Sequence, residues 1–583
     1  MDKKEKKGFG MKLTVSNFEY AYIFLFLFLF LYLGCANLFD NKISHDFPYG
    51  YLASDTFQHQ TRVEGIKNEG GYNFEPFYIV KGYKDVVGYY PPIIYHAGII
   101  FSYMSGLQTY DGLYFLVFFF AGMASVTMYF FIRKFSRDAA LLSLPIMLLL
   151  FSQKPYIGFV WGHWPSLTAQ YLLVAFFLAV TLAAIEYRWL VYGILFTGVM
   201  LSHTSEFVFL GIFTIIYLVY LLITKNRFIE ELKNVIYGGI LAVAVSAYYL
   251  LIFYNSWMKT QPYEFHITTN WGGTPILMLG DFGYFVLFFM MLGVVYFAVM
   301  TYSKKNEKKA GKNKIEKEEN IGKNLHLIPL LVSAFALIVG YANYFGFDFR
   351  AYQSRFFWPI YLSALFGFGI LIAIDLLKVR KKSVIFGVSI AAILLFSGFV
   401  SSGGALPAYS KINSPGLMNL NEWQSFKWIQ DNTNSEDKIF FLYGDVYNQD
   451  AILRNAERVP FLAFETDIID AIQNRTVKRY YNTEISTDSG AGFPYRKSAF
   501  ILGMHSGEKS NENFNAPGVY DICSFDYVVF DKASVQPVLA QYNIIVANDM
   551  IKTGWIKPVY QNDLAVILKN EKPGVDCLEE RSI

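Results

Sequence analysis

Long apolar blocks separated by short polar segments dominate the first two thirds of the chain. We place eleven of them, at residues 20–38, 112–132, 139–153, 168–185, 189–202, 206–224, 235–254, 282–302, 326–343, 356–377 and 383–401. A helix that crosses a membrane needs about 20 apolar residues, and flanking aromatic residues can lengthen the shorter blocks. The pattern therefore predicts a polytopic α-helical membrane protein with about 11 transmembrane helices.

The polar segments between these blocks alternate in composition. Every second segment is rich in lysine and arginine, and the positive-inside rule assigns such loops to the cytoplasm. The largest is the Lys-rich loop 303–325, which holds eight lysines and four glutamates. Residues 91–104 are also apolar, but counting them as a crossing would reverse every later loop. We therefore expect this segment to lie along the membrane surface.

The first apolar block follows a cluster of lysines at the start of the chain. It is longer than the core of a usual signal peptide, and no convincing cleavage site follows it. We interpret it as a retained signal anchor, which places the N-terminus in the cytoplasm and the protein in the cytoplasmic membrane.

The remaining loops, beginning with the first outer loop 39–111, carry isolated acids, histidines and arginines. In the first of them Asp55, His59 and Arg62 have helical spacing, so a helix over residues 54–66 would place all three on one face. The candidates in the other loops and at their edges are Asp46, His163, His203, Glu206, Glu264, His266, Arg350 and Arg355. All of these residues are predicted to face the same outer side of the membrane.

The composition changes after residue 401, where mixed polar sequence begins. Residues 1–401 are thus predicted to form the membrane domain, and residues 402–583 a soluble domain that an odd number of spans places outside the cytoplasm. Within it, residues 417–430 have helical periodicity, whereas residues 438–443, 525–530 and 564–568 look like buried strands. We expect an α/β domain. Cys523 and Cys577 either form a disulfide there or remain free thiols.

The overall composition excludes several classes of protein. Of the 583 residues 54% are hydrophobic and 19% aromatic, which is far from the composition of a soluble enzyme. The formal net charge of +3 implies no nucleic-acid partner. No CxxC, HExxH, Walker or GxGxxG motif occurs in the required context, so the sequence makes no case for zinc, P-loop or Rossmann chemistry.

Several short segments, in their order along the chain, resemble the GT-C superfamily of membrane glycosyltransferases. They are Ser54-Asp55-x-x-x-His59, Gly70-Gly71-Tyr72, Tyr89-Tyr-Pro-Pro-Ile93, Phe130-Phe-Ile-Arg133, Trp161-Gly-His-Trp-Pro165, Leu201-Ser-His-Thr204, Gln353-Ser-Arg-Phe356 and Trp428-Ile-Gln-Asp-Asn-Thr433. The similarity runs over most of the chain as a pattern. It implies transfer of a sugar from a polyprenyl-phosphate-linked donor to a glycan, lipid or protein acceptor on the outer face of the membrane.

Two departures narrow what the resemblance implies. The chain lacks the WWDYG motif of oligosaccharyltransferase catalytic subunits, and residues 153–167 contain none of the acids of their second acidic motif. The Asp-Glu pair of protein mannosyltransferases is also absent, since Thr56 follows Asp55. En bloc glycan transfer to asparagine therefore becomes the alternative, as does a transporter or flippase of lipid-linked glycans or a non-catalytic glycan receptor.

Sugar transfer of this kind requires a base for the acceptor hydroxyl and positive charge for the departing phosphate. Asp55 is the candidate base, with a helix cap as its structural alternative. His59 would orient Asp55, bind the sugar, or join Asp55 and Asp46 around a divalent cation, Mg²⁺ or Mn²⁺. Arg355 with Arg350 would bind the donor phosphate, and the alternative for Arg355 is an interfacial anchor.

The remaining candidates are assigned to the substrate cavity. They are Asp46, Arg62, His163, His203, Glu206, Glu264 and His266. Glu206 lies one helical turn beyond His203 and is a candidate partner for it.

Overall fold

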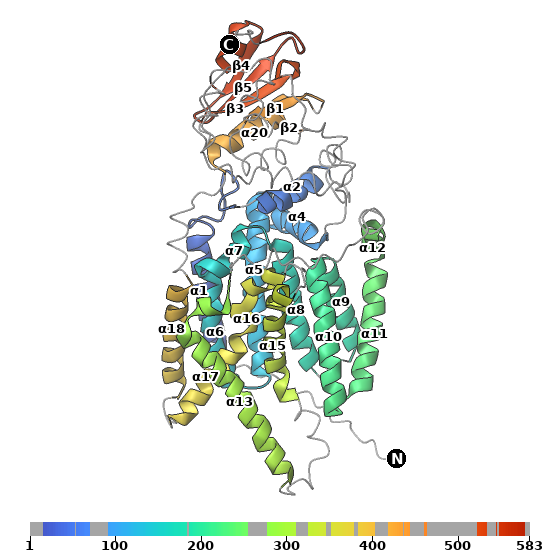
Figure 1. Ribbon diagram of the computed structural model, residues 1–583, viewed down its shortest axis with the longest axis vertical. Coiled ribbons are helices and arrows are strands. Elements are labelled where there is room, and N and C mark those ends of the chain that lie inside the picture. The colour runs from blue at the N-terminus through green and yellow to red at the C-terminus, as the bar shows by residue number, and fades with distance from the viewer. Residues whose placement is uncertain are drawn as a thin grey trace.

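The computed structural model describes residues 16–52, 54–69, 91–182, 186–254, 277–309, 325–345, 351–377, 383–402, 418–434, 436–442, 460–462, 522–532, 544 and 547–577. A bundle of helices makes up most of the described chain, and a small β-sheet lies at one end of it (Figure 1). We call this end of the bundle the sheet end.

Helices occupy all eleven of the predicted apolar blocks. They are α1 (Asn17–Asn37), α5 (Thr109–Arg133), α6 (Arg137–Met147) with η1 (Leu148–Phe151), α8 (Trp164–Thr181), α9 (Arg188–Met200), α10 (Thr204–Thr224), α11 (Phe228–Val245) with α12 (Ala247–Phe253), α13 (Tyr284–Lys309), α15 (Ile328–Gly340), η7 (Ala351–Phe357) with α16 (Trp358–Tyr361) and α17 (Ser363–Leu376), and α18 (Ser383–Ser401). The prediction of a polytopic helical membrane protein is confirmed.

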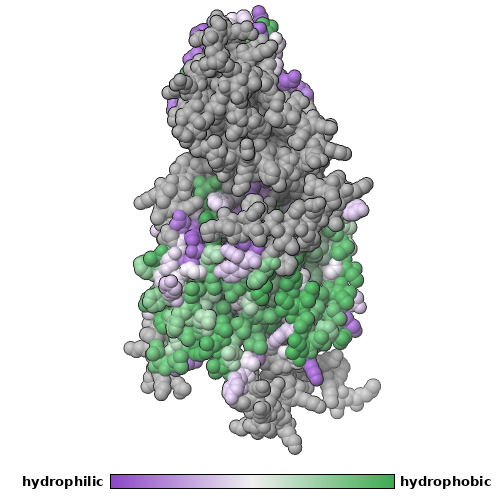
Figure 2. All heavy atoms as spheres, in the orientation of Figure 1, coloured by the Kyte–Doolittle hydropathy of each residue, from purple (hydrophilic) through white to green (hydrophobic). Residues whose placement is uncertain are grey.

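The number of crossings is less sharply defined than the helices themselves. Six helices in the described part of the chain are long and apolar enough to span a membrane, or seven if α11 and α12, which meet at 67°, form one bent span. On the face seen in Figure 2, apolar residues cover the bundle in a continuous band. The count of about 11 transmembrane helices stays a prediction.

Two further helices lie together at the sheet end, α2 (Ser54–Glu69) and α4 (Ile93–Ser105) (Figure 1). Helix α4 packs against α2 and α5. Its 13 residues extend over about 20 Å, which is less than the roughly 30 Å of a bilayer core. The position of α4 agrees with the prediction that residues 91–104 lie along the membrane surface.

Buried ion pairs join the helices at the end opposite the sheet. The Glu19 carboxylate accepts hydrogen bonds from Tyr129 (2.8 Å) and Arg133 (2.5 Å), which links α1 to α5. Arg188 and Glu231 form a similar buried pair between α9 and α11. Because removing one partner of a buried pair typically costs about 3–5 kcal/mol, these contacts fix the helices relative to one another.

The C-terminal sheet has five strands in the order β2-β1-β3-β5-β4. The strands are β1 (Ile439–Leu442), β2 (Pro460–Leu462), β3 (Tyr527–Asp531), β4 (Ile556–Gln561) and β5 (Ala565–Asn570). Strands β2, β1 and β3 are parallel, and β5 runs antiparallel to β3 and β4. Helix α20 (Leu420–Asn432) packs against β4 and β5. The α/β class predicted for this region is confirmed.

Three of the five strands and the helix follow the predicted pattern, and two strands were missed. Strand β2 is only three residues long and begins with Pro460. Strand β4 is at the sheet edge and contains Pro558, beside a shift in register. Proline lowers the strand signal because it lacks a backbone N–H donor. The predicted boundary after residue 401 adjoins a segment outside the described residues, so the division into two domains stays a prediction.

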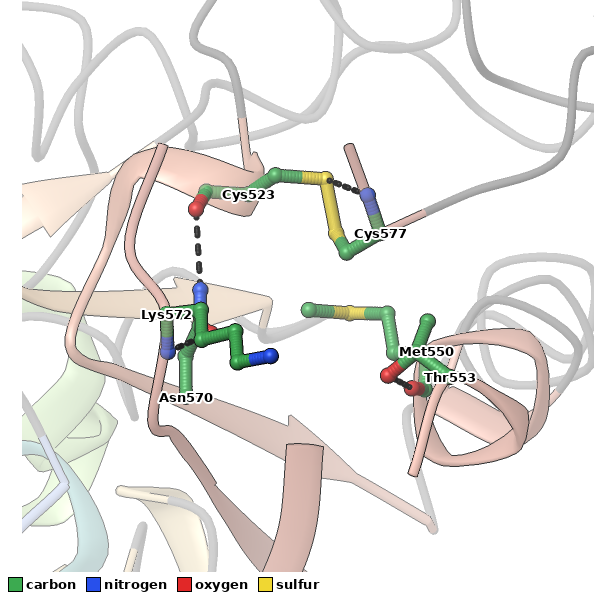
Figure 3. The surroundings of a disulfide bond; sticks show 6 residues. All are labelled: Cys523, Met550, Thr553, Asn570, Lys572 and Cys577. Carbon is green, nitrogen blue, oxygen red and sulfur yellow. Dashed lines mark hydrogen bonds between the residues drawn. A yellow bond between two sulfur atoms is a disulfide. The ribbon is translucent and has the colours of Figure 1, made fainter. Parts of the chain in front are cut away.

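A disulfide joins Cys523 and Cys577, which settles the question that the sequence left open. The Cys523 carbonyl accepts hydrogen bonds from the Gly574 backbone and the Asn570 side chain, both at 2.8 Å (Figure 3). The bond therefore fastens the segment that follows β5 to the segment that precedes β3.

We predict that replacing both cysteines by alanine lowers the free energy of unfolding of the C-terminal sheet by about 4 kcal/mol, because the bond closes a loop with a sequence separation of 54. Pulse proteolysis in urea, following the C-terminal fragment, measures this change. Cys35→Ala removes a cysteine that is not in a disulfide and is the matched control. Equal urea midpoints for the double variant and the control would contradict the prediction.

Candidate functional site

Helix α2 carries the three residues that the first loop contributes to the site. It runs over Ser54–Glu69, which includes the predicted helical residues 54–66. Asp55 lies in its first turn, where the positive end of the helix dipole stabilises a carboxylate. Asp55 is partly exposed, whereas His59 and Arg62 are 3% and 1% exposed. Asp55 is thus the member of this group that an outside molecule can reach.

His59 and Arg62 pack against the helices below α2. Nδ1 of His59 lies 2.9 Å from the Tyr95 hydroxyl, and the His59 ring also contacts Trp164. The Arg62 guanidinium lies 5.9 Å from the centre of the Tyr95 ring and donates a hydrogen bond to the Gln58 carbonyl. Both side chains therefore hold α2 onto α4 and α8, and the predicted common face is directed toward the bundle.

A metal site is not assembled in the described part of the chain. No group of three or more His, Cys, Asp or Glu residues there is close enough to hold an ion. Asp46 accordingly does not join Asp55 and His59 in such a group. The divalent cation remains a prediction that these residues do not support.

The turn between α7 (Gln153–Val160) and α8 is pressed against the start of α2. Gly162 in this turn has φ = +79°, and a Cβ atom there would lie 2.5 Å from the Thr56 nitrogen and 2.7 Å from the Asp55 carbonyl carbon. Just before α2, the Leu52 N–H donates to the Val160 carbonyl at 2.9 Å. Only a glycine fits this close approach, so the turn determines where Asp55 lies.

His163 in the same turn is connected to η7. Its Nδ1 lies 2.8 Å from Nε2 of Gln353, and its ring stacks on Phe356 with the centroids 5.2 Å apart. The Gln353 carbonyl accepts a hydrogen bond from the Gln170 side chain at 3.2 Å. Gln353 thus joins the turn beside Asp55 to helix α8.

A buried carboxylate continues this hydrogen-bonded chain. Glu206, 1% exposed, accepts hydrogen bonds from Ser166 (2.6 Å) and Gln170 (3.4 Å), and it pairs with His203. The predicted partnership of His203 with Glu206 is present. Ser166, Gln170 and Gln353 were not among the predicted site residues. Their only signal was that Ser166 and Gln170 are polar residues spaced by one turn in an apolar helix.

Arg355 is the most buried cation of the site, at 1% exposure. Its guanidinium donates to the Gly340 carbonyl (2.6 Å) at the end of α15 and to the Asn343 side chain (2.7 Å). The rings of Tyr341, Tyr344 and Trp358 surround it, with centroids 5.2–5.9 Å away. No carboxylate in the described ranges pairs with Arg355, so its positive charge has only neutral partners. A buried charge of this kind attracts an anion.

Asp46 lies apart from Asp55, in a cavity of about 270 Å³ beneath α20. Nearby, the Tyr51 hydroxyl donates to the Tyr110 carbonyl at 2.8 Å. Burial, together with the Asp111 carboxylate, raises the pKa of Tyr51 well above its ordinary value, so this phenol remains a neutral donor. Arg62, His163, His203 and Glu206 are therefore in the packed part of the site, and Asp46 in a separate cavity.

Three predicted site residues, Glu264, His266 and Arg350, lie outside the described residues. Their assigned roles stay predictions.

Comparison with solved structures identifies the fold. The archaeal oligosaccharyltransferase AglB from Archaeoglobus fulgidus, in complex with an inhibitory peptide and a dolichol-phosphate, is similar over 88% of this chain and 70% of its own, at 12% identity and a TM-score of 0.51. ArnT from Cupriavidus metallidurans bound to undecaprenyl phosphate is similar over 95% of this chain and 99% of its own, at 11% identity and the same TM-score. Both are GT-C glycosyltransferases.

The chain has the GT-C fold. The resemblance inferred from the short segments is thereby confirmed at the level of structure. No protein-family model matches the chain, and no curated protein matches it by sequence. The GT-C similarity is thus carried by the arrangement of helices, at an identity too low for close sequence matches.

We predict that Gly162→Ala destabilises the protein more than Gly106→Ala does. Both glycines have positive φ, and Gly106 has no atom within 4 Å of where its Cβ would lie. The backbone cost of about 1–2 kcal/mol is shared, whereas overpacking of about 1–3 kcal/mol is expected only at Gly162. Thermal unfolding of the detergent-solubilised protein measures the difference. Equal losses of stability would show that the turn does not press on α2.

Proposed function

We propose that this protein is an integral membrane glycosyltransferase that moves a sugar from a polyprenyl-phosphate donor to an acceptor hydroxyl. The observation that carries this proposal is the GT-C fold, since one similar structure contains a dolichol-phosphate and the other undecaprenyl phosphate. In this chain an accessible carboxylate and a buried, anion-seeking arginine both belong to segments that pack together at the sheet end of that fold. The acceptor is a glycan, a lipid or a protein.

Asp55 is proposed as the general base. In the transition state the acceptor oxygen loses its proton while the sugar becomes oxocarbenium-like, and a positioned carboxylate typically contributes about 10²–10⁴ to the rate of such a step. The partly exposed side chain of Asp55 meets the requirement that the acceptor hydroxyl can approach it. Gly162 and the His163–Gln353 contact support its backbone from below.

Arg355 is proposed to bind the donor phosphate. The sugar–phosphate bond breaks with negative charge accumulating on the phosphate, and a guanidinium that can donate two parallel hydrogen bonds stabilises that charge. Arg355 has no carboxylate partner in the described ranges, and its aromatic surroundings lower the local dielectric. An arriving phosphate would supply the missing counter-charge.

Transfer of a single sugar is favoured over en bloc transfer. The chain is similar to 99% of ArnT but to only 70% of AglB. It also lacks the WWDYG motif and the second acidic motif of oligosaccharyltransferases. A flippase is less well supported, because the polar candidates of the described chain belong to segments that gather at one end of the bundle and do not line a path through it.

The outer face of the cytoplasmic membrane is the proposed location of the site. The Lys-rich loop 303–325 follows the apolar part of α13 and, by the positive-inside rule, lies in the cytoplasm. Disulfides persist in oxidising compartments, and the Cys523–Cys577 bond belongs to the sheet at the other end of the bundle.

We predict that Asp55→Asn lowers sugar transfer by at least about 10²-fold, because the amide cannot accept the acceptor proton. The measurement is transfer of radiolabelled sugar from polyprenyl-phosphate donors in membranes with matched expression. Asp40→Asn replaces an exposed acid of the same loop, at φ = +45° where asparagine is well tolerated, and should retain transfer. Wild-type turnover by Asp55→Asn would refute the role of Asp55.

We also predict that Arg355→Gln weakens binding of undecaprenyl phosphate and transfer together. A ligand that binds the folded state raises the unfolding temperature, so the shift produced by undecaprenyl phosphate should nearly vanish in this variant. Arg227→Gln, which changes a surface arginine paired with Glu230, is the control and should keep the full shift. An undiminished shift in Arg355→Gln would place the phosphate elsewhere.

A further inference from the structure

The cavity that contains Asp46 lies where the membrane bundle meets the C-terminal sheet. Its lining residues are Ser44, His45, Asp46, Glu64, Gln108, Tyr110, Trp423 and Lys427. They come from the segment after α1, from α2, from the start of α5, and from α20, which lies between the sheet and α2 in Figure 1. The C-terminal part of the chain therefore supplies one wall of this cavity.

The back of the cavity is rigid. Tyr110 donates a hydrogen bond to the His45 carbonyl at 2.7 Å, and the Trp423 ring packs edge-on against Tyr110 at 5.6 Å. The His45 backbone N–H and Nδ1 both contact the Asp111 carboxylate, at 2.7 and 2.9 Å, and Nε2 lies 3.1 Å from the Phe39 carbonyl. Because both ring nitrogens are engaged, His45 is a fixed part of the wall.

The front of the cavity carries polar groups with unused hydrogen-bonding capacity. The Asp46 carboxylate and the Gln108 amide have no hydrogen-bond partner among the described residues, and Glu64 accepts from Thr109. Opposite them, Lys427 donates to Gln430 at 2.8 Å and lies 5.2 Å from the centre of the Trp423 ring. An ammonium group has three donors, so Lys427 can still bind another oxygen.

This set of groups matches the chemistry of a sugar ring. Carboxylates accept hydrogen bonds from hydroxyl groups, an ammonium donates to ring and hydroxyl oxygens, and an amide does both. Two carboxylates against one ammonium disfavour an anion, and no three-ligand metal group is present in the described chain. The volume of 270 Å³ is just below the roughly 300–1,000 Å³ of sites for drug-sized ligands, which suits a single ring.

We propose that this cavity binds one sugar ring of a saccharide acceptor, and that the C-terminal domain completes the site through Lys427 and Trp423. The proposal rests on the proposed function for the identity of the molecule, since an acceptor hydroxyl on a sugar would be brought to the same side of the bundle as Asp55. Binding of the ring itself is independent of catalysis. It can therefore be tested without any donor.

The test uses the full-length, detergent-solubilised protein and saturation-transfer difference NMR. The probes are methyl glycosides of glucose, galactose, mannose and N-acetylglucosamine, and 2-methoxytetrahydropyran is a ring of the same size without hydroxyl groups. At least one glycoside should give ring-proton signals, whereas the hydroxyl-free ring should give none. Asp46→Asn and Lys427→Met, which change opposite walls, should each weaken binding about tenfold, as expected for a lost hydrogen bond to a charged group.

The matched control is Lys557→Met, which removes an exposed lysine of β4 that pairs with Glu571 outside the cavity. It should leave binding unchanged, and unfolding temperatures would verify that all variants are folded. Absence of signal from every glycoside, equal signals from the hydroxyl-free ring, or undiminished binding in both cavity variants would each overturn the proposal. Glycoside binding without transfer from any polyprenyl-phosphate sugar would instead leave this proposal standing and refute the proposed function.

Discussion

The hydrogen bonds of Gln353 connect the elements on which the site depends. In a bilayer, buried polar groups must find partners within the protein, because no water is available to satisfy them. Gln353 uses its side chain to contact His163 and its carbonyl to accept from Gln170, and Gln170 in turn reaches Glu206. One residue thus fixes η7, the turn before α8, and α8 itself. The carboxylate of Asp55 and the guanidinium of Arg355 are positioned from opposite sides of this junction.

The site treats its charged groups in two different ways. Glu206 is compensated by His203 and by hydroxyl and amide donors, so its burial requires nothing from outside. Arg355 has only neutral partners, although the carbonyl at the end of α15 lies at the negative end of a helix dipole. The first group stabilises the empty protein, whereas the second is left with a charge that an incoming anion would balance. Such a division is expected where binding, and not folding, is meant to complete the electrostatics.

Much of the architecture could be predicted from the sequence because apolar length is a strong local signal. The helices at the eleven blocks, the surface helix α4, and the strands β1, β3 and β5 all follow from runs of apolar residues. The pairing of His203 with Glu206 was also accessible, since their spacing brings them together on one turn. Contacts between distant segments were not. Nothing in the local sequence around Tyr95 indicates that it meets His59, nor does Gln353 announce that it meets His163. Long-range contacts depend on how helices pack, which one sequence does not encode in any short window.

The disulfide between Cys523 and Cys577 has a consequence for how the molecule is assembled. In the proposed orientation the cytoplasm is reducing, so this bond forms only after the C-terminal part of the chain has been translocated. Helix α20, which packs on the sheet that the bond secures, supplies Trp423 and Lys427 to the cavity over α2. The helical bundle can insert and pack beforehand. The cavity is therefore the last part of the protein to be completed, and a chain that has not yet matured outside the membrane lacks it.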